Sequence, residues 1–175
     1  MIIIFILLLI NVYSASAYTK IGHYRWRNDD GTETSATWKA ATDAPLQIST
    51  HDLRGVRLRI DIESSRDATI DPLLQYSKDN GATWILLDNN LNTLNDFRIF
   101  RSALVIDTYE NNLYYARTTQ QISTGTSFVV GRVMEYFLTP TTPFVLSAGQ
   151  STEYEYGIYP TSHVEPSQTY IFKIV

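Results

Sequence analysis

The chain contains no cysteine among its 175 residues. This absence excludes disulfide bridges, thiolate metal ligands and cysteine nucleophiles. A domain of this length can still fold without disulfides, because it is long enough to bury a substantial core.

Charged residues are also scarce, at 18% of the chain, with 14 basic and 18 acidic side chains. The basic residues form no block or stripe that could follow a phosphate backbone, so we predict no nucleic-acid partner. Only three histidines occur, His23, His51 and His163, and none has a second histidine two or four positions away. Nucleophile-elbow, Walker and dinucleotide-binding motifs are absent from the sequence as well. We predict that the protein is not an enzyme.

The only long apolar run is at the N-terminus, over residues 2–10. It is too short to cross roughly 30 Å of hydrocarbon as a helix. Ala15 and Ala17 stand at the −3 and −1 positions of a signal-peptidase site. We predict that residues 1–17 are a signal peptide and that residues 18–175 form one secreted or cell-surface domain, with no membrane contact after cleavage. The alternative is an uncleaved membrane anchor.

Apolar residues alternate with charged ones along Val56–Glu63. Val56, Leu58, Ile60 and Ile62 would share one face of a strand, and Arg57, Arg59, Asp61 and Glu63 the other. Similar alternation occurs over 152–158 and 170–175. Weaker strand candidates are 21–28, 32–38, 73–77, 83–87, 97–106, 113–118 and 128–138.

Clusters of Asn, Asp, Gly and Pro separate these segments, and no window shows a sustained helical period. The pattern predicts an all-β fold, an antiparallel β-sandwich of about eight to ten strands with jelly-roll or immunoglobulin-like order.

The segment Ser77–Trp84 fits the pattern S-x-D-x-G-x-T-W and resembles the Asp-box hairpin of sialidases and other β-propellers. We expect Gly81 to adopt a positive φ, Ser77 and Asp79 to accept hydrogen bonds from turn amides, and Trp84 to pack beneath the loop, with Thr83 completing the motif. A single copy cannot form a propeller, and it predicts a structural turn and not a glycosidase site.

Two oxygen-rich loops are weak candidates for Ca²⁺ binding, one at Asp79 with Asn80 and the other at Asp88 with Asn90. Ordinary turn chemistry is the alternative reading of both, so metal content stays undetermined and no other cofactor is predicted. Exposed tyrosines such as Tyr114 and Tyr115 are candidates for stacking on sugar rings.

Near the start of the domain, Asp30-Gly31 between two alternating runs predicts a hairpin. Tyr24 and Trp26 would share one face of its first strand, and Arg25 and Arg27 the other. We expect these arginines to join a surface charge network with nearby acids or to stack on aromatic rings.

Three strings, YRWRNDDGTE, LQYSKDNGATW and EYEYGIYPTSHVEPSQTYIFK, occur in the same order as in a family of secreted modules that the chain resembles. Those modules belong to large surface proteins of uncultured bacteria and related microbes. The resemblance covers nearly all of residues 21–174 and implies an extracellular β-sandwich with no catalytic residues to transfer.

The leading interpretation is an extracellular structural protein, a filament or pilus-like subunit assembling by exchange of terminal strands. Self-association or contact with other surface proteins or glycans would follow. The alternative is an adhesion module that binds carbohydrate or protein. A glycan hydrolase is the third reading, and it would require two carboxylates in a cleft.

Overall fold

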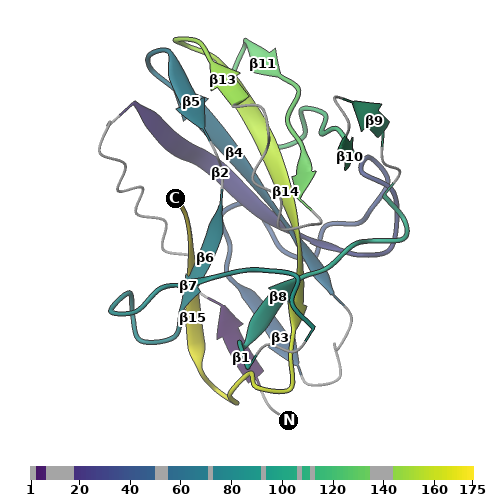
Figure 1. Cartoon of the computed structure of the whole chain (residues 1–175), viewed down its shortest axis with the longest axis vertical. Helices are drawn as coiled ribbons and strands as arrows, with labels where there is room; N and C mark the ends of the chain where they lie inside the picture. Colours follow the sequence, from purple (N-terminus) through teal and green to yellow (C-terminus); the bar gives the residue numbers. More distant parts are fainter. Residues whose placement is uncertain are drawn as a thin grey trace.

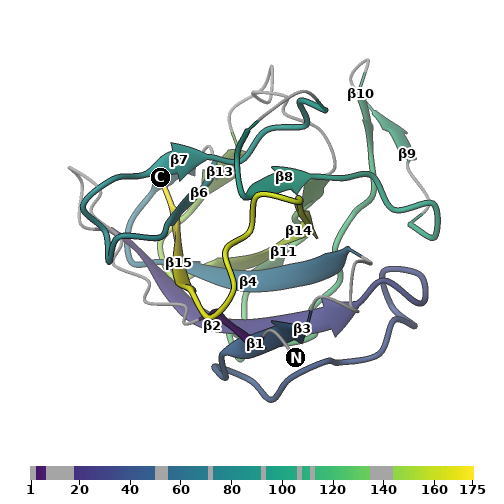
Figure 2. The same ribbon diagram turned by 90° about the horizontal axis from the view of Figure 1, so that it is seen from below.

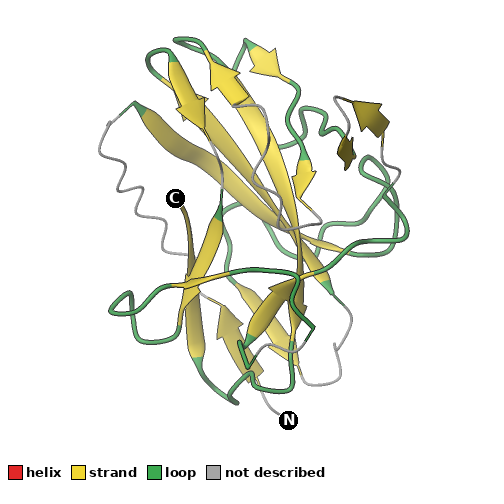
Figure 3. Cartoon of the chain, viewed as in Figure 1, coloured by secondary structure: helices red, strands yellow, loops and turns green. Residues whose placement is uncertain are grey.

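The structure is a computed structural model that describes residues 3–6, 18–49, 55–70, 73–91, 94–105, 108–110, 113–134 and 144–175. Strands and loops make up all of these residues, with no helix among them (Figure 3). The all-β prediction is therefore confirmed. No helix in this part of the chain could span a membrane.

Fifteen strands are present in the described part. They are β1 (Ile3–Ile6), β2 (Thr19–Asn28), β3 (Leu46–Ser49), β4 (Val56–Ser64), β5 (Ala68–Ile70), β6 (Leu74–Ser77), β7 (Ile85–Leu86), β8 (Phe97–Ile99), β9 (Thr108–Glu110), β10 (Leu113–Tyr115), β11 (Phe128–Val129), β12 (Val133–Met134), β13 (Phe144–Leu146), β14 (Ser151–Pro160) and β15 (Thr169–Ile174).

The larger sheet is built on three long antiparallel strands in the order β14-β4-β2, which Figure 1 shows side by side. Three short strands, β11, β12 and β8, add successively along the other edge of β14. A second sheet has the order β3-β1-β15-β6-β7, and two small pairs, β13-β5 and β10-β9, complete the described strands.

The sheets are mixed and not purely antiparallel, which corrects the expectation from the sequence. β1 runs parallel to β15, and β11 and β12 run parallel to β14. These pairings join segments far apart in the chain, and alternation along a single strand carries no information about the direction of its neighbour. A jelly-roll or immunoglobulin-like order stays a prediction.

One apolar core lies between the two sheets. Trp26 of β2 meets Phe172 of β15 edge to face at a centroid distance of 5.9 Å, and Phe97 of β8 meets Tyr170 of β15 at 4.8 Å. The inward residues of β4 join this core, as their alternation predicts. In the view from below, β2 lies on one side of the molecule and β6, β7 and β8 on the other (Figure 2).

The predicted hairpin at Asp30-Gly31 is replaced by a wide loop, because residues 32–38 form no strand. The chain does return antiparallel, with the Asn28 amide donating to the Thr37 carbonyl at 2.9 Å and a single bridge from Arg27 to Trp38. The Asp30 carboxylate stabilises this loop by accepting bonds from both the amide and the hydroxyl of Thr37. Side-chain capping here takes the place of a tight turn.

Candidate functional site

The Asp-box-like residues lie in the turn between β6 and β7. Gly81 has a φ of 89°, and its amide donates to the Ser77 hydroxyl at 2.9 Å. Asp79 accepts from the Thr83 amide at 2.8 Å. Hydrogen bonds from the Ser77 and Thr83 hydroxyls hold the pKa of Asp79 at about 2. Trp84 lies near Gly81, and the Lys173 ammonium lies 4.1 Å from the Trp84 ring centroid.

The candidate Ca²⁺ ligands lie in two ordinary turns. Asp79 uses its carboxylate inside its own turn, with Asn80 beside it in a left-handed conformation at a φ of 56°. Asp88 accepts a bond from the Asn90 amide at 3.1 Å. Among the described residues, no three acidic or histidine side chains come together as a metal site. Bound calcium stays an untested expectation.

Tyr114 and Tyr115, the proposed stacking residues, belong to β10, which pairs with β9. Their side chains lie outside the described part of the structure, so their availability for sugar rings stays a prediction.

The charged face of the large sheet is buried, contrary to the surface network expected for Arg27. The side chains of Arg27, Arg57 and Arg59 are 0% exposed, and so are those of Glu153 and Glu155 on β14. Alternation along β4 correctly divides its side chains into two faces, but both faces of this strand are covered. The expected stacking on an aromatic ring is confirmed for Arg25 and Arg27, which lie 4.4 and 4.6 Å from the Trp38 ring centroid.

Glu155 is the centre of the buried charges. Its carboxylate accepts hydrogen bonds from Arg27 at 3.0 Å, Arg57 at 3.0 Å and Arg59 at 2.8 Å. Arg59 also donates to Glu153 and, at 2.6 Å, to Glu33. A buried charge is tolerated only when it is paired and hydrogen-bonded, and each of the three arginines is paired with a glutamate of the cluster.

Two loops close over these charges and are held by them. The backbone amides of Gln121, Ile122 and Ser123 donate to one oxygen of Glu153 at 2.7, 2.8 and 2.8 Å. Glu33, in the loop 29–38, accepts a hydrogen bond from the amide of Thr119, in the loop 117–127, at 2.8 Å. The charges therefore fasten loops 29–38 and 117–127 to the sheet, and Glu153 and Glu155 are occupied by these contacts.

Asp61 is the exception within this buried face. It is 0% exposed, lies opposite Glu153 across the β4–β14 ladder, and neither carboxylate oxygen has a hydrogen bond of normal geometry. Gly22 of β2 covers it so closely that a Cβ there would lie 2.3 Å from one oxygen. Burial raises the pKa of Asp61 to about 6, an effect that the nearby Ser123 hydroxyl only partly offsets.

A strand position in the smaller sheet is filled by the predicted signal peptide. β1 lies between β3 and β15, antiparallel to the first and parallel to the second. In this register Ile6 is the Cα partner of both Leu46 and Tyr170, whose side chains are buried in the core. The sequence predicts this apolar run as a leader or an uncleaved membrane anchor and does not reveal the strand, because strand pairing of its residues depends on β3 and β15.

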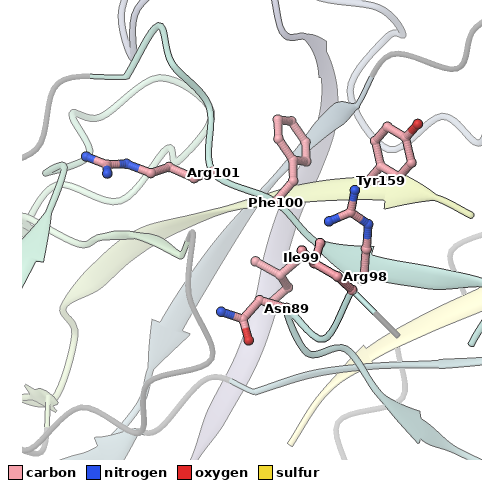
Figure 4. A pocket seen from close by; sticks show the side chains of 7 residues that line it. Asn89, Arg98, Ile99, Phe100, Arg101 and Tyr159 are labelled. Carbon is pink, nitrogen blue, oxygen red and sulfur yellow. The ribbon is translucent and has the colours of Figure 1, made fainter. Parts of the chain in front are cut away.

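A surface pocket of about 450 Å³ opens beside β8 and β14 (Figure 4). It is lined by Asn89, Leu91, Arg98, Ile99, Phe100, Arg101 and Tyr159. Arg98 and Tyr159 are cross-strand partners, and the guanidinium carbon lies 4.6 Å from the tyrosine ring centroid. The pocket could not be predicted from the sequence, because its lining residues come from one loop and two strands that are far apart in the chain.

The buried charge cluster also escaped sequence reasoning, although a signal was present. Arginines occupy alternate positions 57 and 59, and glutamates occupy alternate positions 153 and 155, so neighbouring strands would bring the opposite charges together.

No protein-family model matches the chain, and neither the curated proteins nor the solved structures contain a match. The interpretation of function therefore depends on the geometry above.

Proposed function

We propose that the protein is an extracellular structural subunit that assembles with copies of itself by strand exchange. The observation that carries the proposal is the position of β1 between β3 and β15. Removal of residues 1–17 on export would leave a strand-wide gap inside the smaller sheet. Backbone groups of β3 and β15 would then face each other across that gap without partners.

An open sheet edge of this kind accepts a strand from another chain, because backbone hydrogen bonds supply affinity independently of sequence. A second copy is the occupant in this proposal. Its strand would pair antiparallel to β3 and parallel to β15, beside the buried side chains of Leu46 and Tyr170.

The terminal strands of the described domain are already paired within the chain. β2 pairs with β4, and β15 pairs with β6 on the side away from β1. Exchange of either strand would require it to leave its own sheet. The β1 position would be open without such a rearrangement once residues 1–17 are removed, so we assign it as the acceptor. The strand that fills it must leave its own sheet in the second copy.

The buried charges fit a structural role. Glu153, Glu155 and the three arginines hold two loops against the sheet, so their charge is used internally. This arrangement favours a scaffold over the hydrolase reading, which requires carboxylates that can reach a substrate.

Light scattering on the purified chain 18–175 tests the proposal. We expect the average mass to rise with protein concentration, and we expect assembly to be prevented when residues 1–17 are retained in a detergent-solubilised full-length chain. A monomer at every concentration of the shorter chain would contradict the proposal.

A further inference from the structure

The pocket beside β8 is framed by rigid backbone. The Ile99 amide donates to the Asp88 carbonyl at 2.6 Å, which fixes the preceding loop, and the Phe100 amide donates to the Gly157 carbonyl at 3.0 Å, which fixes β14. The Phe100 ring lies directly on Gly55, where an added Cβ would come within 2.2 Å of it. The wall formed by Phe100 is therefore preformed and does not depend on a ligand.

Two arginines line this pocket, and Arg98 is the one beside its aromatic ring. Its guanidinium stacks on Tyr159, whereas Arg101 extends away from the other lining side chains (Figure 4). Arg98 forms no ion pair in the described part of the chain, and none of the described lining residues is acidic. By contrast, the buried arginines 27, 57 and 59 are all neutralised by glutamates.

Stacking uses the face of the guanidinium and leaves its N–H groups in the plane free to form hydrogen bonds. Such a fork matches a carboxylate, which accepts two parallel bonds from it. Around it the pocket offers an aromatic ring at Tyr159, apolar surface at Leu91 and Phe100, and an amide at Asn89. Rings and apolar surface suit the C–H face of a sugar, and the amide and phenol suit its hydroxyl groups.

We propose that this pocket binds a carboxylate-bearing sugar, such as a hexuronic acid residue of an acidic polysaccharide. Arg98 holds the carboxylate, Tyr159 orients the guanidinium, and Asn89 contacts a hydroxyl group. The volume of about 450 Å³ is within the range of small-molecule sites. This activity is independent of self-assembly and would attach an assembled protein to an acidic glycan surface.

Calorimetric titration or saturation-transfer NMR of the chain 18–175 with methyl glucuronide tests this assignment. We expect binding of the glucuronide and at least ten-fold weaker binding of methyl glucoside, which lacks the carboxylate. The Arg98→Gln substitution should weaken glucuronide binding at least ten-fold. Arg98→Lys should also weaken it, because lysine keeps the charge but not the planar fork.

Arg66→Gln is the matched control, since Arg66 stacks on Tyr18 at 4.5 Å outside this pocket. It should leave glucuronide binding unchanged, and the melting temperature of each variant checks its fold. Equal binding of glucoside and glucuronide would overturn the proposal. Unchanged binding in Arg98→Gln, full binding in Arg98→Lys, or equal affinity for acetate alone would overturn it as well. Light scattering of the same samples reports assembly separately, so the two proposals fail independently.

Discussion

At the scale of single residues, the structure contrasts a buried carboxylate that is paired with one that is not. The Glu155 carboxylate accepts hydrogen bonds from three arginines. The Asp61 carboxylate has no hydrogen-bond partner of normal geometry and lies close to the carboxylates of Glu63 and Glu153. The two groups lie on the same buried face but have opposite consequences for stability.

Replacing Asp61 with Asn should stabilise the protein at neutral pH. Burial raises the pKa of Asp61 to about 6, above the value of about 3.9 in an unfolded chain. Between these values the folded state binds more protons, so the free energy of unfolding rises as pH falls from 7 towards 4. We expect Asp61→Asn to remove this slope and to add about 1–3 kcal/mol at pH 7.

Urea unfolding from pH 4.5 to 7.5 measures the effect as the difference between the variant and the parent chain. Equal stability at pH 7 with an unchanged pH slope would mean that Asp61 is solvated.

Replacing Glu155 with Gln should be strongly destabilising, by about 3–5 kcal/mol, because it leaves buried arginines without their shared counter-charge. Glu165→Gln is the control, since Glu165 pairs with Lys78 at 2.8 Å on the surface. There we expect a loss of less than about 1 kcal/mol. Similar losses in the two variants, measured by urea unfolding at pH 7, would contradict a buried network.

At the scale of elements, the proposed acceptor position requires a backbone amide of β3 to donate a hydrogen bond to the incoming strand. In an antiparallel ladder, one of every two successive residues donates its amide to a given neighbour. The double substitution Gln47→Pro with Ile48→Pro therefore removes the donor to the β1 position, whichever of the two residues supplies it. Gln47→Thr with Ile48→Thr keeps both amides and favours a strand.

We expect the proline pair to abolish concentration-dependent assembly of the chain 18–175 and the threonine pair to preserve it. Sedimentation velocity measures the assembly, and circular dichroism checks the fold of each variant. Assembly by the folded proline pair would show that β3 is not part of the acceptor.

The strands also differ in how well the sequence predicts them. The alternation over Val56–Glu63 located β4 to within a residue and identified its core side chains, because burial imposes a period of two. It did not reveal that the other face is covered as well, since the covering loops come from 29–38 and 117–127. Short strands such as β3 and β13 were missed, because they exist through partners distant in the sequence.

At the scale of the whole molecule, the chain combines a scaffold, a proposed acceptor position for a strand and a surface pocket. The scaffold is the pair of sheets with its shared aromatic core and the charges that hold two loops. The proposed acceptor lies in the smaller sheet, while the pocket lies beside β8 and β14, which belong to the larger sheet. The proposed binding of an acidic sugar and the proposed polymerisation therefore use separate sites.

Cryo-electron microscopy of the concentrated chain 18–175 tests the central claim most directly. The account predicts ordered assemblies in which a strand from a neighbouring copy lies between β3 and β15, parallel to β15. Monomers, or assemblies in which no strand from another copy lies between β3 and β15, would contradict it.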